Sequence, residues 1–187
     1  MFEMIQSLDE TILRWIEAHL RLSWLNGPVM FYSTLGNAGL LFIVATLLLL
    51  CFRRTRKMGA AAAAGLIVDL LVVNVTIKPL VSRPRPWLTM AGFQNLLTSS
   101  DPNSFPSGHT CAAFAFAAAI CMTAPKKWMK AAARIVAALM GLSRLYVGVH
   151  YPSDVLAGAV IGTVCGLLGA WIIRRFTQWR QSRKAAE

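Results

Sequence analysis

The polar residues that could carry chemistry gather in three short segments, each beside a long apolar run. The segments span 78–86, 105–109 and 143–154, and they contribute the cations Lys78, Arg85 and Arg144. Arginine matches the geometry of phosphate with paired donors, and lysine adds a point charge. Charges at the edge of an apolar run are costly and usually have a partner. The acids nearby are few, namely Asp69, Asp101 and Asp154. This excess of cations predicts an anionic ligand.

The second segment reads Pro-Ser-Gly-His and precedes an apolar run, so we place it at a helix N-terminus. Free backbone N–H groups and the helix dipole favour an anion at such an end. Gly108 lets the backbone approach closely, and the hydroxyl of Ser107 can donate a hydrogen bond. The segment therefore predicts a phosphate cradle that needs no metal ion.

Two histidines and an aspartate complete the set. His150 lies four residues before Asp154, with Pro152 between them to form a turn. Asp154 could accept a hydrogen bond from one ring nitrogen and leave the other free to attack. His109 could protonate the leaving oxygen and later activate water. These groups cover the roles that phosphoryl transfer requires.

The three segments resemble the motifs of the type 2 phosphatidic acid phosphatase superfamily, which also includes vanadium haloperoxidases. The family patterns K-x6-R-P, P-S-G-H and S-R-x5-H-x3-D occur here in the family's order, without a gap or a substitution. By this resemblance His150 forms a phosphohistidine, Asp154 orients it and His109 is the general acid. The resemblance also implies the phosphate-binding residues Lys78, Arg85, Ser107, Gly108 and Arg144, with no metal and no cofactor.

The composition favours a bilayer as the solvent. The 187 residues are 56% hydrophobic and only 14% charged, with a mean hydropathy of +0.54. Apolar runs long enough to span a bilayer lie at roughly 28–52, 58–79, 107–124, 131–149 and 154–175. Apolar residues at helical spacing over 3–20 predict an amphipathic helix on the membrane surface. We expect an all-α polytopic bundle of five spans, or six if the N-terminal helix also crosses.

The basic residues predict the orientation of this bundle. Of the 19 Lys and Arg residues, 13 follow the first, third and fifth spans, on one side of a five-span bundle. The positive-inside rule makes that side cytoplasmic and places the three motifs outside. The same clustering argues against nucleic acid as the partner of this chain of net charge +11. We expect one domain over 1–187, with an interfacial helix at 1–22, a transmembrane core at 28–175 and a cytoplasmic tail at 176–187 that is frayed and solvated from Gln181 onward.

The sequence leaves open the roles of three residues in or just after the second span. Arg83 lies outside the fixed motif positions and fits either contact with the lipid or anchoring at the interface. Asn74 lies four residues before Lys78 and shares its helix face. Asp69 lies nine residues before Lys78, which in an α-helix is the opposite face, so we expect no direct pair between them.

The resemblance implies a metal-independent lipid phosphatase of the outer membrane face. Its expected substrate is undecaprenyl diphosphate, whose hydrolysis to the monophosphate recycles the carrier for cell-wall synthesis. Phosphatidylglycerol phosphate and phosphatidic acid are the alternatives, because the motifs bind the phosphate and not the tail. A non-hydrolytic lipid-binding or transport protein and a vanadate-dependent haloperoxidase are alternatives of other classes. The sequence leaves the oligomeric state and the route of lipid entry open, with the second and third spans as our first choice.

Overall fold

The computed structural model describes residues 2–98 and 101–186, so the ends of the predicted domain at 1 and 187 lie outside the described residues. The regular secondary structure of the described residues is helical, apart from an isolated bridge between Pro84 and Asn103. Its α-helices are α1 (Phe2–His19), α2 (Ser23–Leu35), α3 (Leu40–Cys51), α4 (Arg56–Asp69), α5 (Lys78–Val81), α6 (Pro86–Thr89), α7 (Gly108–Thr123), α8 (Lys127–Tyr146) and α9 (Pro152–Ala186). A 3-10 turn, η1 (Asn37–Gly39), and a π-helix, η2 (Leu70–Ile77), complete the order.

The first predicted span is broken instead of continuous. Helices α2 and α3 meet at η1 and are bent by 53°. Ala38 and Gly39 adopt positive φ angles of 51° and 70°, which a helix cannot contain. Glycine adopts such angles at little cost, and alanine does so only against a steric penalty. The bend turns the η1 segment toward the start of α7.

The second predicted span is one continuous helical rod over Arg56–Val81, but its middle is a π-helix. A π-helix bonds residue i to i+5 and is uncommon outside functional sites. The insertion changes which side chains share a face, and this matters for the site below.

Small residues allow the long helices to pack closely. A Cβ at Gly166 would lie 2.2 Å from the carbonyl oxygen of Ala115 in α7, so α9 can approach α7 only because glycine occupies this position. Small residues of α4 also lie in a helix contact, since Ala61 and Ala62 are buried against Ala119 and Ala170. Close approach of small residues is the usual basis of helix packing in membranes.

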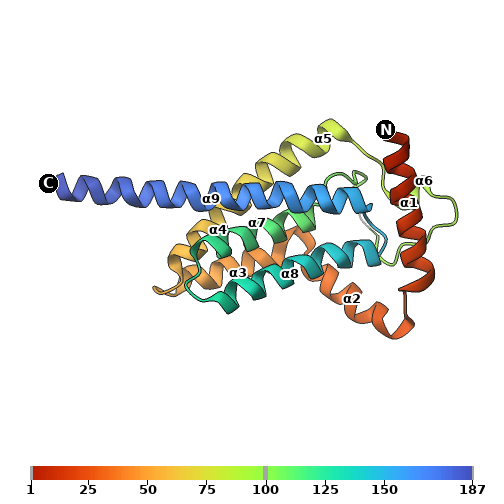
Figure 1. Ribbon diagram of the computed structural model, residues 1–187, viewed down its shortest axis with the longest axis horizontal. Helices are drawn as coiled ribbons and strands as arrows, with labels where there is room; N and C mark the ends of the chain where they lie inside the picture. The colour runs from red at the N-terminus through yellow and green to blue at the C-terminus, as the bar shows by residue number, and fades with distance from the viewer. Residues whose placement is uncertain (1, 99–100, 187) are drawn as a thin grey trace.

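Figure 1 shows the long helices side by side, with α1 lying across one end of the bundle. Leu13 and Ile16 of α1 are buried, whereas Met4, Leu8 and Ile12 are exposed. The amphipathic helix predicted over 3–20 is therefore present. The predicted frayed tail is wrong, because α9 continues as a helix to Ala186 and projects beyond the other helices (Figure 1).

Two of the described helices are long and apolar enough to cross a membrane, Arg56–Val81 and Pro152–Lys184. The bent pair of α2 and α3 makes a third if it counts as one span. Helix α7 is apolar but has only 16 residues, fewer than the usual 20. Length and composition of the described helices thus account for two or three of the five predicted spans.

Candidate active site

A cavity of about 580 Å³ opens where α5 begins, α7 begins and the α8–α9 turn closes the bundle. Of the eight site residues predicted from the sequence, six line this cavity: Lys78, Arg85, Gly108, His109, Arg144 and His150. They come from three segments far apart in the chain. The structure thus brings both histidines and all three predicted cations to one place.

The other two predicted residues, Ser107 and Asp154, lie behind the wall of the cavity. Both are buried, and the backbone N–H of Ser107 donates to the carbonyl oxygen of Asp154 over 3.1 Å. The Ser107 hydroxyl pairs with that of Thr110 at 2.9 Å. Ser107 therefore joins the start of α7 to the start of α9, and its hydroxyl is engaged within the protein.

His150 is buried, and its two ring nitrogens have different surroundings. A guanidinium N–H of Arg85 lies 3.2 Å from Nε2. Because arginine only donates, Nε2 must be the acceptor nitrogen of a neutral ring, with the proton on Nδ1. Burial lowers the pKa of His150 to about 3, and Arg85 and Arg144 act in the same direction, although the Asp154 carboxylate opposes them. The ring thus presents a lone pair on Nε2 at neutral pH.

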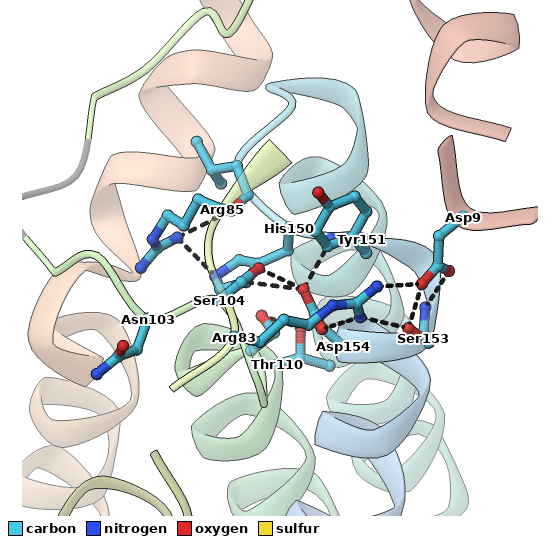
Figure 2. A network of polar contacts seen from close by, with 12 residues as sticks. Asp9, Arg83, Arg85, Asn103, Ser104, Thr110, His150, Tyr151, Ser153 and Asp154 are labelled. Atoms are coloured by element: carbon cyan, nitrogen blue, oxygen red, sulfur yellow. Dashed lines mark hydrogen bonds and ion pairs between the residues drawn. The ribbon is translucent and has the colours of Figure 1, made fainter. Parts of the chain in front are cut away.

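The Nδ1 side of His150 faces Asp154, but the expected direct hydrogen bond is absent from the geometry. Nδ1 lies 3.8 Å from Oδ2 of Asp154, which is an ion-pair distance and too long for a hydrogen bond. The hydroxyl of Ser104 lies 3.5 Å from Nδ1 and donates to Oδ2 of Asp154 (Figure 2). Ser104, which the sequence analysis missed, thus stands between the two residues.

His109, near the start of α7, faces the break in the first span. Its Nε2 lies 3.0 Å from Oδ1 of Asn37 in η1. An amide oxygen only accepts, so in this arrangement Nε2 carries the proton. The bend between α2 and α3 is therefore what gives His109 a partner. Asn37 carries no motif, and only its place between two glycines marks it in the sequence.

Arg144 is held from the first span as well. One guanidinium nitrogen donates to the hydroxyl of Ser33 in α2 over 2.6 Å. Its Nε is buried and has no hydrogen-bond partner among the described residues. Buried donors of this kind normally find partners. Arg144 lines the cavity, so it is a cation with bonding capacity left at the site.

The expected excess of cations over acids is smaller than the sequence suggested. Asp101 forms an ion pair with Lys78, and its carboxylate lies 3.6 Å from Arg85. Burial raises the pKa of Asp101, but Lys78, the Asn103 amide and Arg85 outweigh it and hold that pKa below its ordinary value. An anion therefore does meet these cations in the structure, and it is a carboxylate of the protein.

The α-helical face assigned to Asp69 is wrong, because η2 intervenes between it and Lys78. Each turn of a π-helix takes up one residue more than an α-helical turn. Asp69, Asn74 and Lys78 consequently all line the same cavity. Asp69 is buried, and its Oδ1 has no hydrogen-bond partner among the described residues. Helical periodicity alone could not show this, since it assumes a constant turn.

Arg83 does not line the cavity, and only 12% of its side chain is exposed. Its guanidinium lies in a buried network with Asp154 and with Asp9 of α1, on the far side of Asp154 from His150 (Figure 2). Neither of the two roles left open for Arg83 describes this position. Asp9 was missed altogether, because nothing in the amphipathic pattern of 3–20 distinguishes a buried acid from an exposed one.

The arrangement has the parts needed to transfer a phosphoryl group. The lone pair of one histidine, the N–H of another and three cations share one cavity, and backbone donors lie at the start of α7. Cations fixed before the reaction stabilise charge that develops on a transferring phosphoryl group.

Comparison with known proteins identifies the family. The model of the PAP2 superfamily matches residues 58–178. The chain is 35% identical over 152 residues to an undecaprenyl-diphosphatase of Sulfolobus acidocaldarius, covering 81% of this chain and 69% of that protein. The crystal structure of Aquifex aeolicus LpxE matches with a TM-score of 0.74 and 28% identity, covering 85% of this chain and 92% of the other.

A transmembrane PAP2-type phosphatidylglycerolphosphate phosphatase from Bacillus subtilis has a similar fold. Its structure matches with a TM-score of 0.71 and 29% identity over 93% of this chain and 86% of the other. Sequence motifs, family model and fold agree. The chain belongs to the PAP2 superfamily and is a membrane lipid phosphatase of that family.

Proposed function

We propose that this chain hydrolyses undecaprenyl diphosphate to undecaprenyl phosphate through a phosphohistidine on His150. The observation that carries the proposal is the contact between Nε2 of His150 and the guanidinium of Arg85, at 3.2 Å. It puts an unprotonated nitrogen beside a cation within the cavity. An attacking nitrogen and a group that neutralises phosphate oxygens are needed at the same place for in-line phosphoryl transfer.

In the first step Nε2 of His150 attacks the terminal phosphorus, and a P–N bond forms as the P–O bond to the leaving lipid phosphate breaks. His109 gives its proton to the leaving oxygen. Asp154, with Ser104, faces the Nδ1 proton and stabilises the positive ring that results. The negative Asp154 compensates the charge that His150 acquires, as the acid of a catalytic triad does.

In the second step a water molecule attacks the phosphorus of the phosphohistidine. His109, now a neutral imidazole, accepts a proton from that water, and the P–N bond breaks to restore His150 and release inorganic phosphate. Lys78, Arg85 and Arg144 neutralise the phosphoryl oxygens in both steps. The backbone N–H of Gly108 at the start of α7 adds a donor, and Ser107 fixes this end of the helix.

The shape of the cavity supports a lipid substrate. Beyond the polar residues its wall continues along Ile43 of α3 and Leu66, Ile67 and Leu70 of the second span. We propose that the lipid tail leaves between α3 and α4, not between the second and third spans. The 35% identity with the Sulfolobus acidocaldarius undecaprenyl-diphosphatase favours a polyprenyl diphosphate.

The proposal includes the topology expected from the sequence. A single domain has five spans formed by α2 with α3, α4 through α5, α7, α8 and α9, and α1 lies at the interface. The motifs then face outward and the C-terminus is cytoplasmic. The basic residues after the first, third and fifth spans support this orientation.

Phosphatidylglycerol phosphate is the second candidate substrate, because the Bacillus subtilis phosphatase for that lipid covers more of this chain than the other structure does. Purified protein assayed in EDTA for phosphate release from undecaprenyl diphosphate, phosphatidylglycerol phosphate and phosphatidic acid decides between them. We expect the highest kcat/KM with undecaprenyl diphosphate and no turnover by His150→Ala. A higher kcat/KM for either glycerolipid would contradict the substrate, and binding without turnover of any lipid would favour a binding or transport protein.

A further inference from the structure

Arg83 uses all four of its terminal N–H donors within the protein. Nη1 donates to Oγ of Ser153 and Oδ1 of Asp154, both over 2.7 Å. Nη2 donates to Oε1 of Gln6 over 2.6 Å and to Oδ2 of Asp9 over 2.8 Å. No terminal N–H remains to bind a lipid headgroup, and Arg83 does not line the cavity. Its function must therefore lie in the residues that it holds.

The carboxylate of Asp154 is held from two sides. Oδ1 accepts from Arg83, and Oδ2 accepts from the hydroxyl of Ser104 and from the backbone N–H of Tyr151, the latter over 2.9 Å. Asp154 is fully buried, and a buried carboxylate needs a paired charge to remain ionised. The guanidinium of Arg83 also lies 4.0 Å above the ring centroid of Tyr151 (Figure 2). This stacking fixes the orientation of the guanidinium.

Asp9 ties this network to α1. Its carboxylate accepts from Arg83 and from both the backbone N–H and the hydroxyl of Ser153 at the start of α9. Asp9 is 3% exposed, so water does little to screen the pair. Burial works to lower the pKa of Arg83, but its bonds with Asp9 and Asp154 outweigh burial and raise that pKa. One cation thus joins the N-terminal helix to the aspartate behind His150.

We infer that Arg83, held by Asp9 of α1, is a positioning residue that fixes the Asp154 carboxylate behind His150. The inference rests on the proposed role of His150 as nucleophile. Its consequence is that α1, which carries no motif, is part of the catalytic apparatus. Because Arg83 acts on the aspartate and touches no substrate, its loss should lower kcat and leave KM nearly unchanged.

The test compares Arg83→Gln, Arg83→Lys and Asp9→Asn with wild type and His150→Ala, using undecaprenyl diphosphate in detergent. Arg83→Gln should lower kcat by about 10- to 100-fold, as loss of a residue supporting an active-site group does, with KM within about 3-fold of wild type. Arg83→Lys keeps the charge and should recover part of this loss. Asp9→Asn keeps Arg83 and removes one carboxylate, so it should lower kcat by a smaller factor.

Arg14→Gln is the matched control, because Arg14 is exposed and donates a hydrogen bond to the backbone carbonyl of Ala91, outside the network of Arg83 and Asp154. Wild-type kcat in Asp9→Asn and in a folded Arg83 variant, or a rise in KM at unchanged kcat, would overturn the inference. If Arg83→Gln does not fold, Arg83→Lys and Asp9→Asn decide. Failure of the proposed function is recognised separately, since wild type would then release no phosphate or His150→Ala would retain activity.

Discussion

Arg85 places a guanidinium N–H 3.2 Å from Nε2 of His150 and is itself held by two backbone carbonyl groups. Its Nε donates to the carbonyl oxygen of Asp101 over 2.6 Å, and Nη1 also donates to that of Val149 over 2.9 Å. The cation therefore has a fixed position relative to Nε2 of His150, the proposed nucleophile. A group fixed before the reaction requires no reorganisation when charge develops.

Replacing Arg85 with lysine should therefore lower kcat strongly, even though the positive charge is kept. Lysine cannot reach Val149, Asp101 and a phosphoryl oxygen at once, because it lacks the planar fork. We expect kcat to fall by about 10²- to 10³-fold, the cost of losing one fixed donor to a developing charge. Steady-state phosphate release measures this, with the exposed Arg14→Lys as the control. A loss of less than 10-fold would mean that charge alone suffices.

His150 should remain neutral throughout the physiological range, because its pKa is lowered to about 3 by burial. In a His19→Gln, His109→Gln variant it is the sole remaining histidine of the three. Its ¹⁵N ring shifts should then show the Nδ1–H tautomer and no titration between about pH 5 and 8. A midpoint near 6.5 would contradict the buried neutral ring.

The lowered pKa of His150 also predicts how the stability of the protein depends on pH. The folded pKa of His150 lies below the ordinary value of 6.5, so on acidification the unfolded chain binds a proton that the folded chain does not. His150 thus lowers the free energy of unfolding progressively as the pH falls below about 6.5. Thermal unfolding of wild type and His150→Gln in detergent measures this. A smaller acid sensitivity is expected for the variant, and an equal one would contradict the assignment.

Asp101 pairs with Lys78 and Arg85, so we expect its carboxylate to compete with an anionic ligand for these two cations. Asp101→Asn removes the charge but keeps an oxygen that can accept from the backbone N–H of Asn103, as Oδ1 does now. Inorganic phosphate should then inhibit more strongly, by roughly 2- to 5-fold, the range for one partly exposed ion pair. Competition assays give the inhibition constant. Unchanged or weaker inhibition would show that the carboxylate does not oppose the ligand.

Asn37 should matter through His109, whose Nε2 lies 3.0 Å from its side-chain oxygen. Asn37→Ala leaves the imidazole without this partner and should lower kcat by about 10-fold, as the loss of an orienting hydrogen bond does. Thr34→Ala is the matched control, since Thr34 lies near the end of α2, three residues before Asn37, and its hydroxyl donates to the carbonyl oxygen of Phe31 in its own turn. Equal activity of the two variants would contradict the orienting role.

The sequence predicted the residues that line the cavity better than it predicted the residues that hold them. Lys78, Gly108 and His150 were found by residue type and spacing, because phosphate chemistry demands particular side chains in short motifs. Their partners come from elsewhere: Asn37 and Asp9 belong to no motif, and the packing of η1 and α1 against the motif segments selects them.

The sequence likewise predicted where the helices lie but not where they are irregular. Apolar runs located the helical segments, but the bend at η1 and the π-helix η2 depend on tertiary contacts that periodicity does not report. The face assigned to Asp69 failed for this reason, since one irregular turn changes the direction of every side chain before it. The break at η1 had a local signal in Gly36 and Gly39, which in an apolar run can mark a bend.

Trapping the phosphorylated enzyme tests the central claim most directly. Purified protein mixed with undecaprenyl diphosphate labelled in its terminal phosphate is stopped in alkaline detergent, digested and examined by mass spectrometry. We predict a base-stable, acid-labile phosphoryl group on His150, absent from His150→Ala and longer-lived in His109→Gln. Phosphate release by wild type with no label on the chain, or with the label on His109, would contradict the account.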